Sequence, residues 1–501
     1  MPDAVLAIDQ GTTGSTALVL ARDGAVLSRA TEEFTQFYPE PGWVEHDPEE
    51  IWRVSLDVME SALEQASLAE HELRAIGITN QRETTLVWDR KTGKPLHRAI
   101  VWQSRQSAEI CEALRADGLE AMISEHTGLV IDPYFSASKM RWILDRYPDA
   151  RPRAEAGELV FGTIDTWLLY KLTGGAVHAT EPTNASRTLL WDIREQRWDP
   201  ELLEIFDVPA AMLPEVLPSS GVFGTTVPCG DIPGGVPVAG IAGDQQAALY
   251  GQGCWRPGMV KNTYGTGCFV MLNTGSELRR SDCGLLTTVC CDAHGRPAYA
   301  LEGSVFTTGA AIQWLRDEMG LIGSAVETEK VAARVEDTQG VYVVPAFTGL
   351  GAPYWDMRAR GAIVGLTRGS GRDQIIRATL DSIAYQTRDV VDAMNCDGGE
   401  PLSELRADGG AAANNALMQF QADILDLPVI RPQLLETTAA GAAFLAGLGA
   451  GLWRSPKEIE GIWREDRRFV PKMDAAERER RYDGWRRAVE RVRDDRRDPR
   501  S

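Results

Sequence analysis

The sequence near the N-terminus reads Ala4-Val-Leu-Ala-Ile-Asp-Gln-Gly-Thr-Thr-Gly-Ser-Thr-Ala-Leu-Val-Leu20. Two short apolar runs flank the Gly/Thr-rich segment Asp9–Thr16, a pattern that predicts two buried strands joined as a β-hairpin. Glycines and hydroxyl side chains in such a turn bring N–H and O–H donors close to an anion, and a preceding Asp suits a hydrated Mg²⁺. Taken alone, an ordinary hairpin turn explains this segment equally well.

A similar segment recurs in the second half of the chain. Val260–Gly267 is predicted to be a tight polar turn, and a strand follows it at Cys268–Leu272. One hairpin opening each half predicts two similarly built halves with a cleft between them, and Gly and Pro cluster at 251–258 as the boundary. Helical stretches such as Pro48–Met59 and Glu479–Arg497 alternate with short apolar strands, which indicates α/β layering. The predicted strands are Ala75–Ile78, Val341–Val344 and Leu405–Asp408.

Composition and charge favour a cytosolic enzyme of more than one domain. The 501 residues are 44% hydrophobic, an ordinary globular value, and the length suggests roughly two to four domains. The formal net charge of −20 argues against binding to a nucleic acid backbone, which normally requires a basic stripe. We expect no signal peptide and no insertion into a membrane, because the apolar runs are too short.

The cysteines and histidines show no metal-binding spacing. None of the eight cysteines forms a Cys-x-x-Cys pair, so all are expected to be free thiols in a reducing compartment. The six histidines are scattered without a His-Glu-x-x-His spacing, so a zinc hydrolase has no support.

Polar residues that follow predicted strands are the candidates for chemistry. Asp244 and Gln245 follow an apolar strand at the start of a helix, where a carboxylate can accept a proton from a substrate hydroxyl or simply cap the helix. Arg82 and Glu83 follow the strand Ala75–Ile78 and can bind vicinal hydroxyls. From these two residues alone, however, a surface ion pair is the favoured interpretation.

Two further segments are candidates for a nucleotide site. Tyr264-Gly-Thr-Gly267 resembles a second phosphate turn, although an ordinary turn explains it alone. Gly409 and Gly410 leave room for a flat ring, and Asn414 can cap a helix or bind a base, while a plain strand–helix connection is the alternative. The chain has neither a Walker A motif nor a Rossmann fingerprint.

Together these segments resemble the FGGY carbohydrate kinase family, within the actin/hexokinase/Hsp70-type ATPase superfold. The resemblance runs from Val5 to about Arg487 and is closest to the members that act on glycerol. The stretches that carry it are Pro41–Pro48, Asn80–Thr85, Tyr134–Trp142, Gly243–Ala248, Phe347–Trp355, Gly361–Leu366 and Arg377–Asp381.

The resemblance implies an α/β fold of two ribonuclease H-like (actin-type ATPase) domains around a central cleft, at 1–250 and 251–501. It also implies ATP-dependent phosphorylation of glycerol to sn-glycerol 3-phosphate, the first step of glycerol catabolism. ATP and Mg²⁺ are the implied cofactors, and a cytoplasmic homodimer or homotetramer is the implied state.

The resemblance assigns roles residue by residue. It implies that Asp244 is the general base and that Asp9 binds the Mg²⁺ ion through a water molecule. The implied glycerol-binding residues are Arg82, Glu83, Trp102, Tyr134, Asp244, Gln245 and Phe269. The implied nucleotide-binding residues are Thr12, Thr13, Gly14, Thr16, Thr266, Gly309, Gln313, Gly410 and Asn414.

The chain departs from the family pattern in three places. Thr16 stands where the family has an Arg, and the loss of this positive charge predicts a weaker grip on the triphosphate. Gly14 replaces a Ser, but its backbone amide remains as a donor. Asp231–Val236 lacks the Arg with which some relatives bind fructose 1,6-bisphosphate, and the segment after Pro471 departs from the surface that binds a protein regulator. The rival functions are a kinase for a pentulose, gluconate or erythritol, and a non-catalytic nucleotide switch.

Overall fold

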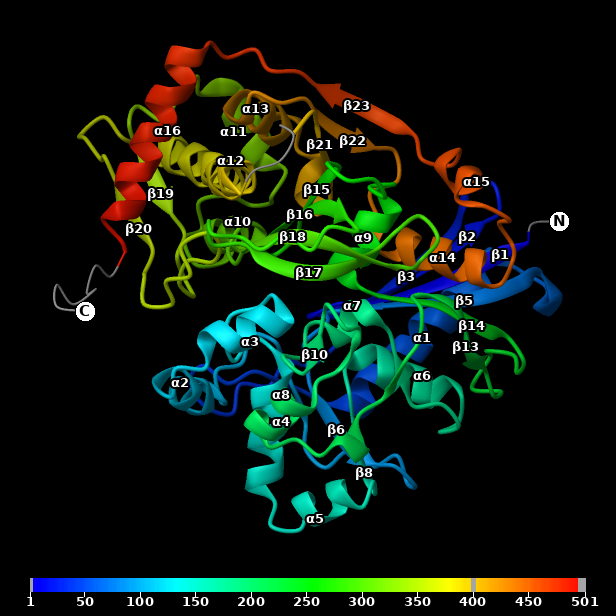
Figure 1. The fold of residues 1–501 in the computed structure, drawn as a ribbon. Coiled ribbons are helices and arrows are strands. Elements are labelled where there is room, and N and C mark those ends of the chain that lie inside the picture. Colours follow the sequence, from blue (N-terminus) through cyan, green and yellow to red (C-terminus); the bar gives the residue numbers. More distant parts are fainter. Residues whose placement is uncertain (1–2, 398–401, 494–501) are drawn as a thin grey trace.

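The computed structural model describes residues 3–397 and 402–493, which form two halves that are each built on one large β-sheet (Figure 1). In the first sheet the strand order is β13-β14-β5-β1-β2-β3. Its strands are β1 (Ala4–Gln10), β2 (Gly14–Ala21), β3 (Val26–Glu33), β5 (Leu73–Asn80), β13 (Ser220–Thr225) and β14 (Pro237–Gly243). The predicted N-terminal hairpin is confirmed. Asp9 and Thr16 pair as strand residues, so the turn consists of residues 11–13 and is shorter than the predicted segment Asp9–Thr16.

The second sheet repeats the arrangement of the first. Its order is β17-β18-β16-β15-β21-β22-β23, and β15 lies antiparallel to β16 and parallel to β21, as β1 does to β2 and β5. Two ribonuclease H-like halves are therefore confirmed. The strands are β15 (Val260–Tyr264), β16 (Cys268–Gly275), β17 (Leu286–Cys291), β18 (Pro297–Val305), β21 (Leu405–Asp408), β22 (Val429–Pro432) and β23 (Glu465–Phe469).

One part of the second hairpin was predicted wrongly. Val260–Gly267 is not a turn throughout, because Val260–Tyr264 forms β15 and pairs residue by residue with β16, so only residues 265–267 turn. Alternate side chains of β15 are therefore fixed in direction, and Lys261 is completely buried.

Helices cover both sheets. Helix α1 (Pro48–Ala66) is capped by Asp47 and buries Ile51, Val58 and Met59 against the first sheet. The helix ends at Ala66, beyond the end at Met59 that the sequence predicts. The C-terminal helix α16 (Ala475–Glu490) buries the predicted stripe of Tyr482, Trp485 and Val489, while residues 494–497 of that prediction lie outside the described residues. The other α-helices of the described ranges are α2 (Ala108–Ala116), α3 (Glu120–Thr127), α4 (Ser136–Arg146), α5 (Ala150–Glu155), α6 (Ile164–Leu172), α7 (Pro182–Ala185), α8 (Pro200–Phe206), α9 (Asp244–Gly251), α10 (Gly309–Asp317), α11 (Glu327–Arg334), α12 (Arg372–Cys396), α13 (Asn415–Leu425), α14 (Thr437–Gly449) and α15 (Pro456–Glu460).

Five two-stranded sheets complete the described structure. The strand predicted at Val341–Val344 is β19, outside the large sheets. The pairs are β4 (Glu45–His46) with β7 (Ala99–Ile100), β6 (Leu86–Asp89) with β8 (Leu159–Gly162), β9 (Ala179–Thr180) with β12 (Glu215–Val216), β10 (Trp191–Asp192) with β11 (Arg197–Trp198), and β19 (Tyr342–Val344) with β20 (Ala362–Val364).

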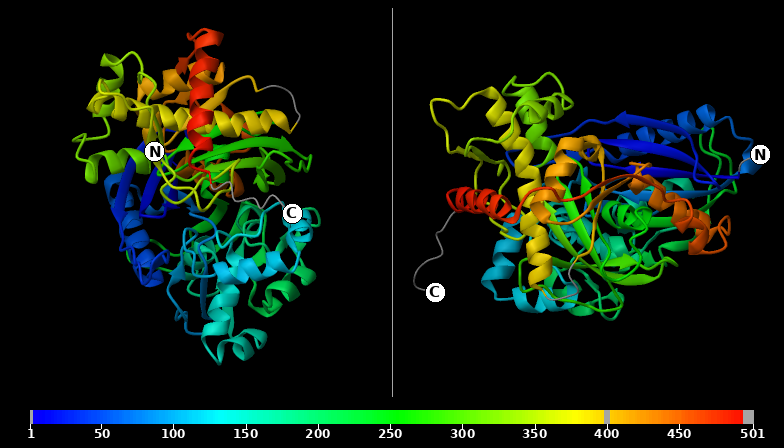
Figure 2. Two further views of the ribbon diagram at one scale, coloured as in Figure 1. Left: turned by 90° about the vertical axis from the view of Figure 1, so that its left-hand side faces the viewer. Right: turned by 90° about the horizontal axis from the view of Figure 1, so that it is seen from above.

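Helix α14 follows the second sheet in the chain but packs on the first. It lies against β1, β5, β14 and α9, and in Figure 1 the orange α14 lies beside the blue strands. In the view from above, the orange C-terminal elements lie next to the blue N-terminal strands (Figure 2). Glycines permit the contact, because a Cβ on Gly77 or Gly441 would collide with the backbone of Ala442 or Ala247. The two halves are thus joined through close backbone packing.

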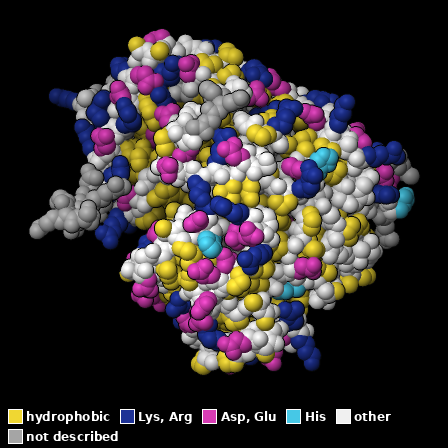
Figure 3. Space-filling view, viewed as in Figure 1, with side chains coloured by type: hydrophobic (Ala, Val, Ile, Leu, Met, Phe, Trp, Pro, Cys, Tyr) yellow, Lys and Arg dark blue, Asp and Glu magenta, His cyan; other side chains and the backbone are white. Residues whose placement is uncertain are grey.

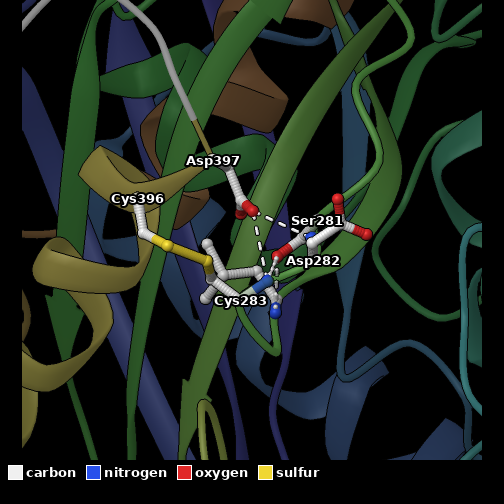
Figure 4. Close-up of a disulfide and its surroundings, with 6 residues drawn as sticks. Ser281, Asp282, Cys283, Cys396 and Asp397 are labelled. Atoms are coloured by element: carbon white, nitrogen blue, oxygen red, sulfur yellow. Dashed lines mark hydrogen bonds between the residues drawn. A yellow bond between two sulfur atoms is a disulfide. The ribbon is translucent and has the colours of Figure 1, made fainter.

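The expectation that all eight cysteines are free thiols is wrong. Cys283, in the loop before β17, is joined to Cys396 at the end of α12, with the two Cα atoms 6.4 Å apart (Figure 4). Asp397 Oδ1 accepts hydrogen bonds from the backbone N–H groups of Asp282 and Cys283 and so holds the same loop. The partners are 113 residues apart in sequence, so spacing gives no sign of the pair.

The surface carries mixed charges. On the face in Figure 3 acidic and basic side chains are interspersed. Among the described helices, none has the length and apolar character needed to cross a membrane.

Candidate active site

The ends of two parallel strands bring the first candidate residues together. Strands β5 and β14 lie side by side, so the residues that follow them, Arg82 and Asp244, meet at the same edge of the first sheet. Arg82 Nε lies 3.1 Å from Asp244 Oδ1. Arg82 and Glu83 are both buried, so the surface ion pair favoured from sequence is wrong. The arrangement places a carboxylate beside a fixed guanidinium.

Three aromatic rings form a wall beside this pair. Tyr134 Oη accepts a hydrogen bond from Arg82 Nη2 at 3.1 Å, and the ring of Phe269 lies 5.4 Å from the Arg82 guanidinium. Trp102 packs edge-on against both rings, with centroids 5.5 Å from Tyr134 and 6.5 Å from Phe269. A cavity of about 700 Å³ opens next to Trp102 and Tyr134. The wall offers apolar faces beside polar donors and acceptors.

Two buried charged residues that sequence analysis missed hold Arg82 and Glu83. Glu302, on β18 of the second sheet, accepts from Arg82 Nη1 at 2.6 Å and from Arg187 Nη2 at 3.1 Å. Arg187 Nε donates in turn to Glu83 Oε1 at 2.7 Å. Burial alone would raise the pKa of Glu302, but Arg187 and Arg82 lower it to about 2. The carboxylate therefore stays charged between the two halves.

Asp244 is held at both carboxylate oxygens. Its Oδ1 accepts from the Gln245 backbone N–H at 2.7 Å, and its Oδ2 accepts from Gln245 Nε2 at 3.0 Å. Desolvation and the charge of Glu83 raise the pKa of Asp244, while Arg82 acts in the opposite direction. A raised pKa together with a fixed orientation suits a group that takes up a proton.

The first hairpin reaches the same site through Thr12. Its Oγ1 accepts from Trp102 Nε1 at 2.9 Å. Thr13 is exposed at the tip, and Gly14 opens β2 beneath the backbone of β3. Thr16 lies on β2, where its hydroxyl is 3.1 Å from that of Thr31 on β3.

Asp9 has the environment of a cation-binding carboxylate. Desolvation, followed by the charges of Asp244 and Glu436, raises its pKa to about 8, and Arg29 counters this only partly. Carboxylates that repel one another in this way are relieved by a divalent cation, and carboxylates and water are ligands that Mg²⁺ prefers. Asp9 therefore fits the Mg²⁺ site expected from sequence.

The second half contributes a separate cavity of about 480 Å³. Gly309 must be a glycine, because a Cβ there would lie 2.5 Å from the Gly265 carbonyl. Asn414 caps α13 by accepting from the Leu417 N–H, so the capping interpretation is confirmed. The cavity contains the five residues expected on the second half of a nucleotide site, Thr266, Gly309, Gln313, Gly410 and Asn414.

Comparison with known proteins assigns the chain to a family. The N-terminal domain of the FGGY family of carbohydrate kinases matches residues 4–251, and its C-terminal domain matches residues 260–450. The chain belongs to the FGGY family. Among curated FGGY relatives, glycerol kinase from Shewanella sp. (strain ANA-3) is 60% identical over 489 residues, covering 98% of this chain and 99% of the relative. Glycerol kinase from Caldanaerobacter subterraneus subsp. tengcongensis is 58% identical over 493 residues, with the same coverage.

Solved structures of the FGGY family agree. Plasmodium falciparum glycerol kinase with ADP superposes with a TM-score of 0.89 at 37% identity, covering 98% of each chain. Ligand-bound xylulose kinase from Lactobacillus acidophilus has a TM-score of 0.84 at 19% identity, with 97% of each chain covered, and shows the shared fold alone.

The buried charge network gives a prediction about stability. Replacing Glu302 by Gln leaves Arg82 and Arg187 without their shared carboxylate, so we expect a loss of about 3–5 kcal/mol in the free energy of unfolding at pH 7. The pKa of about 2 lies below the ordinary value of 4.5. The contribution is therefore complete above pH 4.5 and is lost as the pH falls towards 2. Denaturant titrations of both proteins between pH 7 and pH 3 measure this difference.

Ser304→Ala is the matched control. It removes only the hydroxyl donor to the same carboxylate, 3.1 Å away, and is expected to cost about 1 kcal/mol. Equal stability of Glu302→Gln and wild type at pH 7 would contradict the network's role.

Proposed function

We propose that this protein transfers the γ-phosphoryl group of ATP to glycerol, forming sn-glycerol 3-phosphate and ADP. The observation that carries the proposal is that all seven residues expected to bind glycerol lie in one connected cluster of side chains. Near-complete coverage by glycerol kinases that are 58–60% identical supports the same acceptor.

The pocket suits a small triol. Arg82, Glu83 and Gln245 supply charged and amide groups for hydroxyls, and the aromatic wall packs against the C–H side. Asp244 takes the proton from the attacking hydroxyl as its oxygen bonds to the γ-phosphorus and the bond to the ADP oxygen breaks. In such transfers catalysis consists mainly of positioning and charge stabilisation.

The first hairpin and the cavity of the second half then hold the nucleotide. Thr12, Thr13 and Thr266 contact phosphates, and Gly410 and Asn414 line the adenosine. Thr16 offers a hydroxyl where the family pattern has a guanidinium, so the grip on the triphosphate is weaker. Asp9 would hold a hydrated Mg²⁺ ion, which would supply neutralisation of the phosphate charge. We also propose that the protein is cytoplasmic and forms a homodimer or homotetramer. The boundary between its two domains is proposed to lie at residues 250/251.

Two rival functions predict different pockets. A pentulose or gluconate kinase needs room for a longer carbon chain, and the Arg82–Glu83 pair together with Trp102 argues against such a substrate. A nucleotide switch has no use for a base such as Asp244, which is fixed here at both oxygens.

An ADP-release assay with Mg-ATP tests the acceptor. Glycerol, dihydroxyacetone, erythritol, D-xylulose, D-ribulose and gluconate are compared, and we expect kcat/KM for glycerol to exceed the others by at least about 100-fold. Preference for a longer polyol would leave the family assignment standing and overturn the acceptor. ATP binding without turnover of any acceptor would favour the switch.

Asp244→Asn tests the base. The amide keeps the shape of the pocket but cannot take the proton, so kcat should fall by about 10²- to 10⁴-fold while the Kd for glycerol changes little. Stopped-flow turnover and calorimetric titration measure the two quantities. A variant with near-normal kcat would remove Asp244 from its role.

Adjacent glycines separate nucleotide binding from stability. A Cβ at Gly410 meets no heavy atom within 4 Å and points into open space, so Gly410→Val should weaken ADP binding by about tenfold, ~1.4 kcal/mol, with an unchanged Tm. Gly409 has φ +83°, and its Cβ would lie 2.6 Å from the Tyr264 carbonyl oxygen. Gly409→Ala should therefore lower the Tm. Unaltered ADP affinity in Gly410→Val would place the adenosine elsewhere.

A further inference from the structure

Lys261 is a buried cation that the proposed reaction does not use. It lies on β15 in the second half, and its side chain is completely buried. Its Nζ donates to Gln245 Oε1 at 2.6 Å and to Thr263 Oγ1 at 2.8 Å. Gln245 belongs to α9 and is the residue that donates to Asp244. Lys261, on the second half, is therefore connected to Asp244 on the first half through the side chain of Gln245.

The chemistry of an ammonium group sets the direction of this chain of hydrogen bonds. A charged lysine only donates, so the atom of the Gln245 amide that faces it must be the oxygen. The NH₂ end of the amide then faces Asp244 and donates to Oδ2. With the amide reversed, its NH₂ group would face the ammonium and its oxygen would face the carboxylate, and both contacts would be repulsive.

We propose that Lys261 is a positioning residue for the base, because it locks the Gln245 amide in the one orientation that donates to the Asp244 carboxylate. This role rests on the proposed phosphorylation of a polyol. It makes the orientation of the base depend on a strand of the other half.

The charges around Lys261 determine when it can serve this role. Burial lowers its pKa to about 8, against the opposing effect of nearby carboxylates. The ammonium is therefore charged below pH 8 and is lost above it, so its hold on Gln245 weakens as the pH rises. The charged groups that face it are Asp408 on β21, Asp244 on α9, Glu302 on β18 and Arg82 after β5.

A double-mutant cycle with Gln245 tests whether Lys261 acts through the amide. Lys261→Met keeps an unbranched apolar side chain and removes the donor. We expect kcat to fall by about 10- to 100-fold, the usual effect of losing a residue that orients a functional group through a second side chain. Gln245→Met removes the amide, so adding Lys261→Met to it should lower kcat no further. Multiplicative losses together with a raised KM for ATP would show a direct action on the phosphates and overturn the proposal.

Lys139 supplies the matched control. It is an equally buried lysine, but its Nζ donates to the backbone carbonyls of Tyr134 and Phe135. Lys139→Met measures the cost of deleting a buried ammonium, and its effect on kcat should multiply with that of Gln245→Met. A Lys261→Met variant with a lowered Tm but unchanged kcat would mean a structural role only, against the proposal.

The pH profile of Lys261→Arg keeps the proposal testable if Lys261→Met does not fold. A guanidinium stays charged and only donates, so the fall in wild-type kcat above about pH 8 should disappear in this variant. An unchanged alkaline limb would overturn the proposal. Wild-type turnover of glycerol is measured first: an inactive wild type overturns the proposed function and this role together, whereas an active wild type with multiplicative variants overturns the role alone.

Discussion

A single carboxylate, Glu302, constrains the centre of this molecule. It lies fully buried on the second sheet, and its partners Arg82 and Arg187 both belong to the first half. Buried charges are tolerated only when they are closely paired, so the two halves must meet in the register that joins these groups. Arg82 then has both Nη atoms occupied, and its Nε faces Asp244. The geometry of Asp244, the proposed base, therefore follows from an ion pair between the sheets.

Close backbone packing also fixes how the two halves meet. Helix α14 packs on the first sheet at Gly77 and on helix α9 through Gly441, and at both glycines a side chain would collide with the facing backbone. A helix held this closely has little freedom to slide, because packed interiors leave no void to move into.

Sequence predicted the parts of the structure that depend on local patterns. The hairpins, the position of Asp244 after a strand and the cap at Asn414 follow from turn residues and apolar periodicity. The buried partners of Arg82 and Glu83 did not, because Glu302 lies 220 residues from Arg82 along the chain and Arg187 lies 104 from Glu83. Without those partners, the sequence favours a surface ion pair for Arg82 and Glu83. The disulfide between Cys283 and Cys396 could not be predicted either, because its partners are also far apart in the sequence.

The remaining contacts connect the proposed acceptor site to both predicted phosphate turns. Trp102, which forms the acceptor wall, donates to Thr12 in the first turn. Lys261, which holds the partner of the base, lies on the strand that leads into the second turn, three residues before Tyr264. The aromatic wall and the amide beside Asp244 are therefore each joined by a direct hydrogen bond to a hairpin that carries one of the predicted phosphate turns.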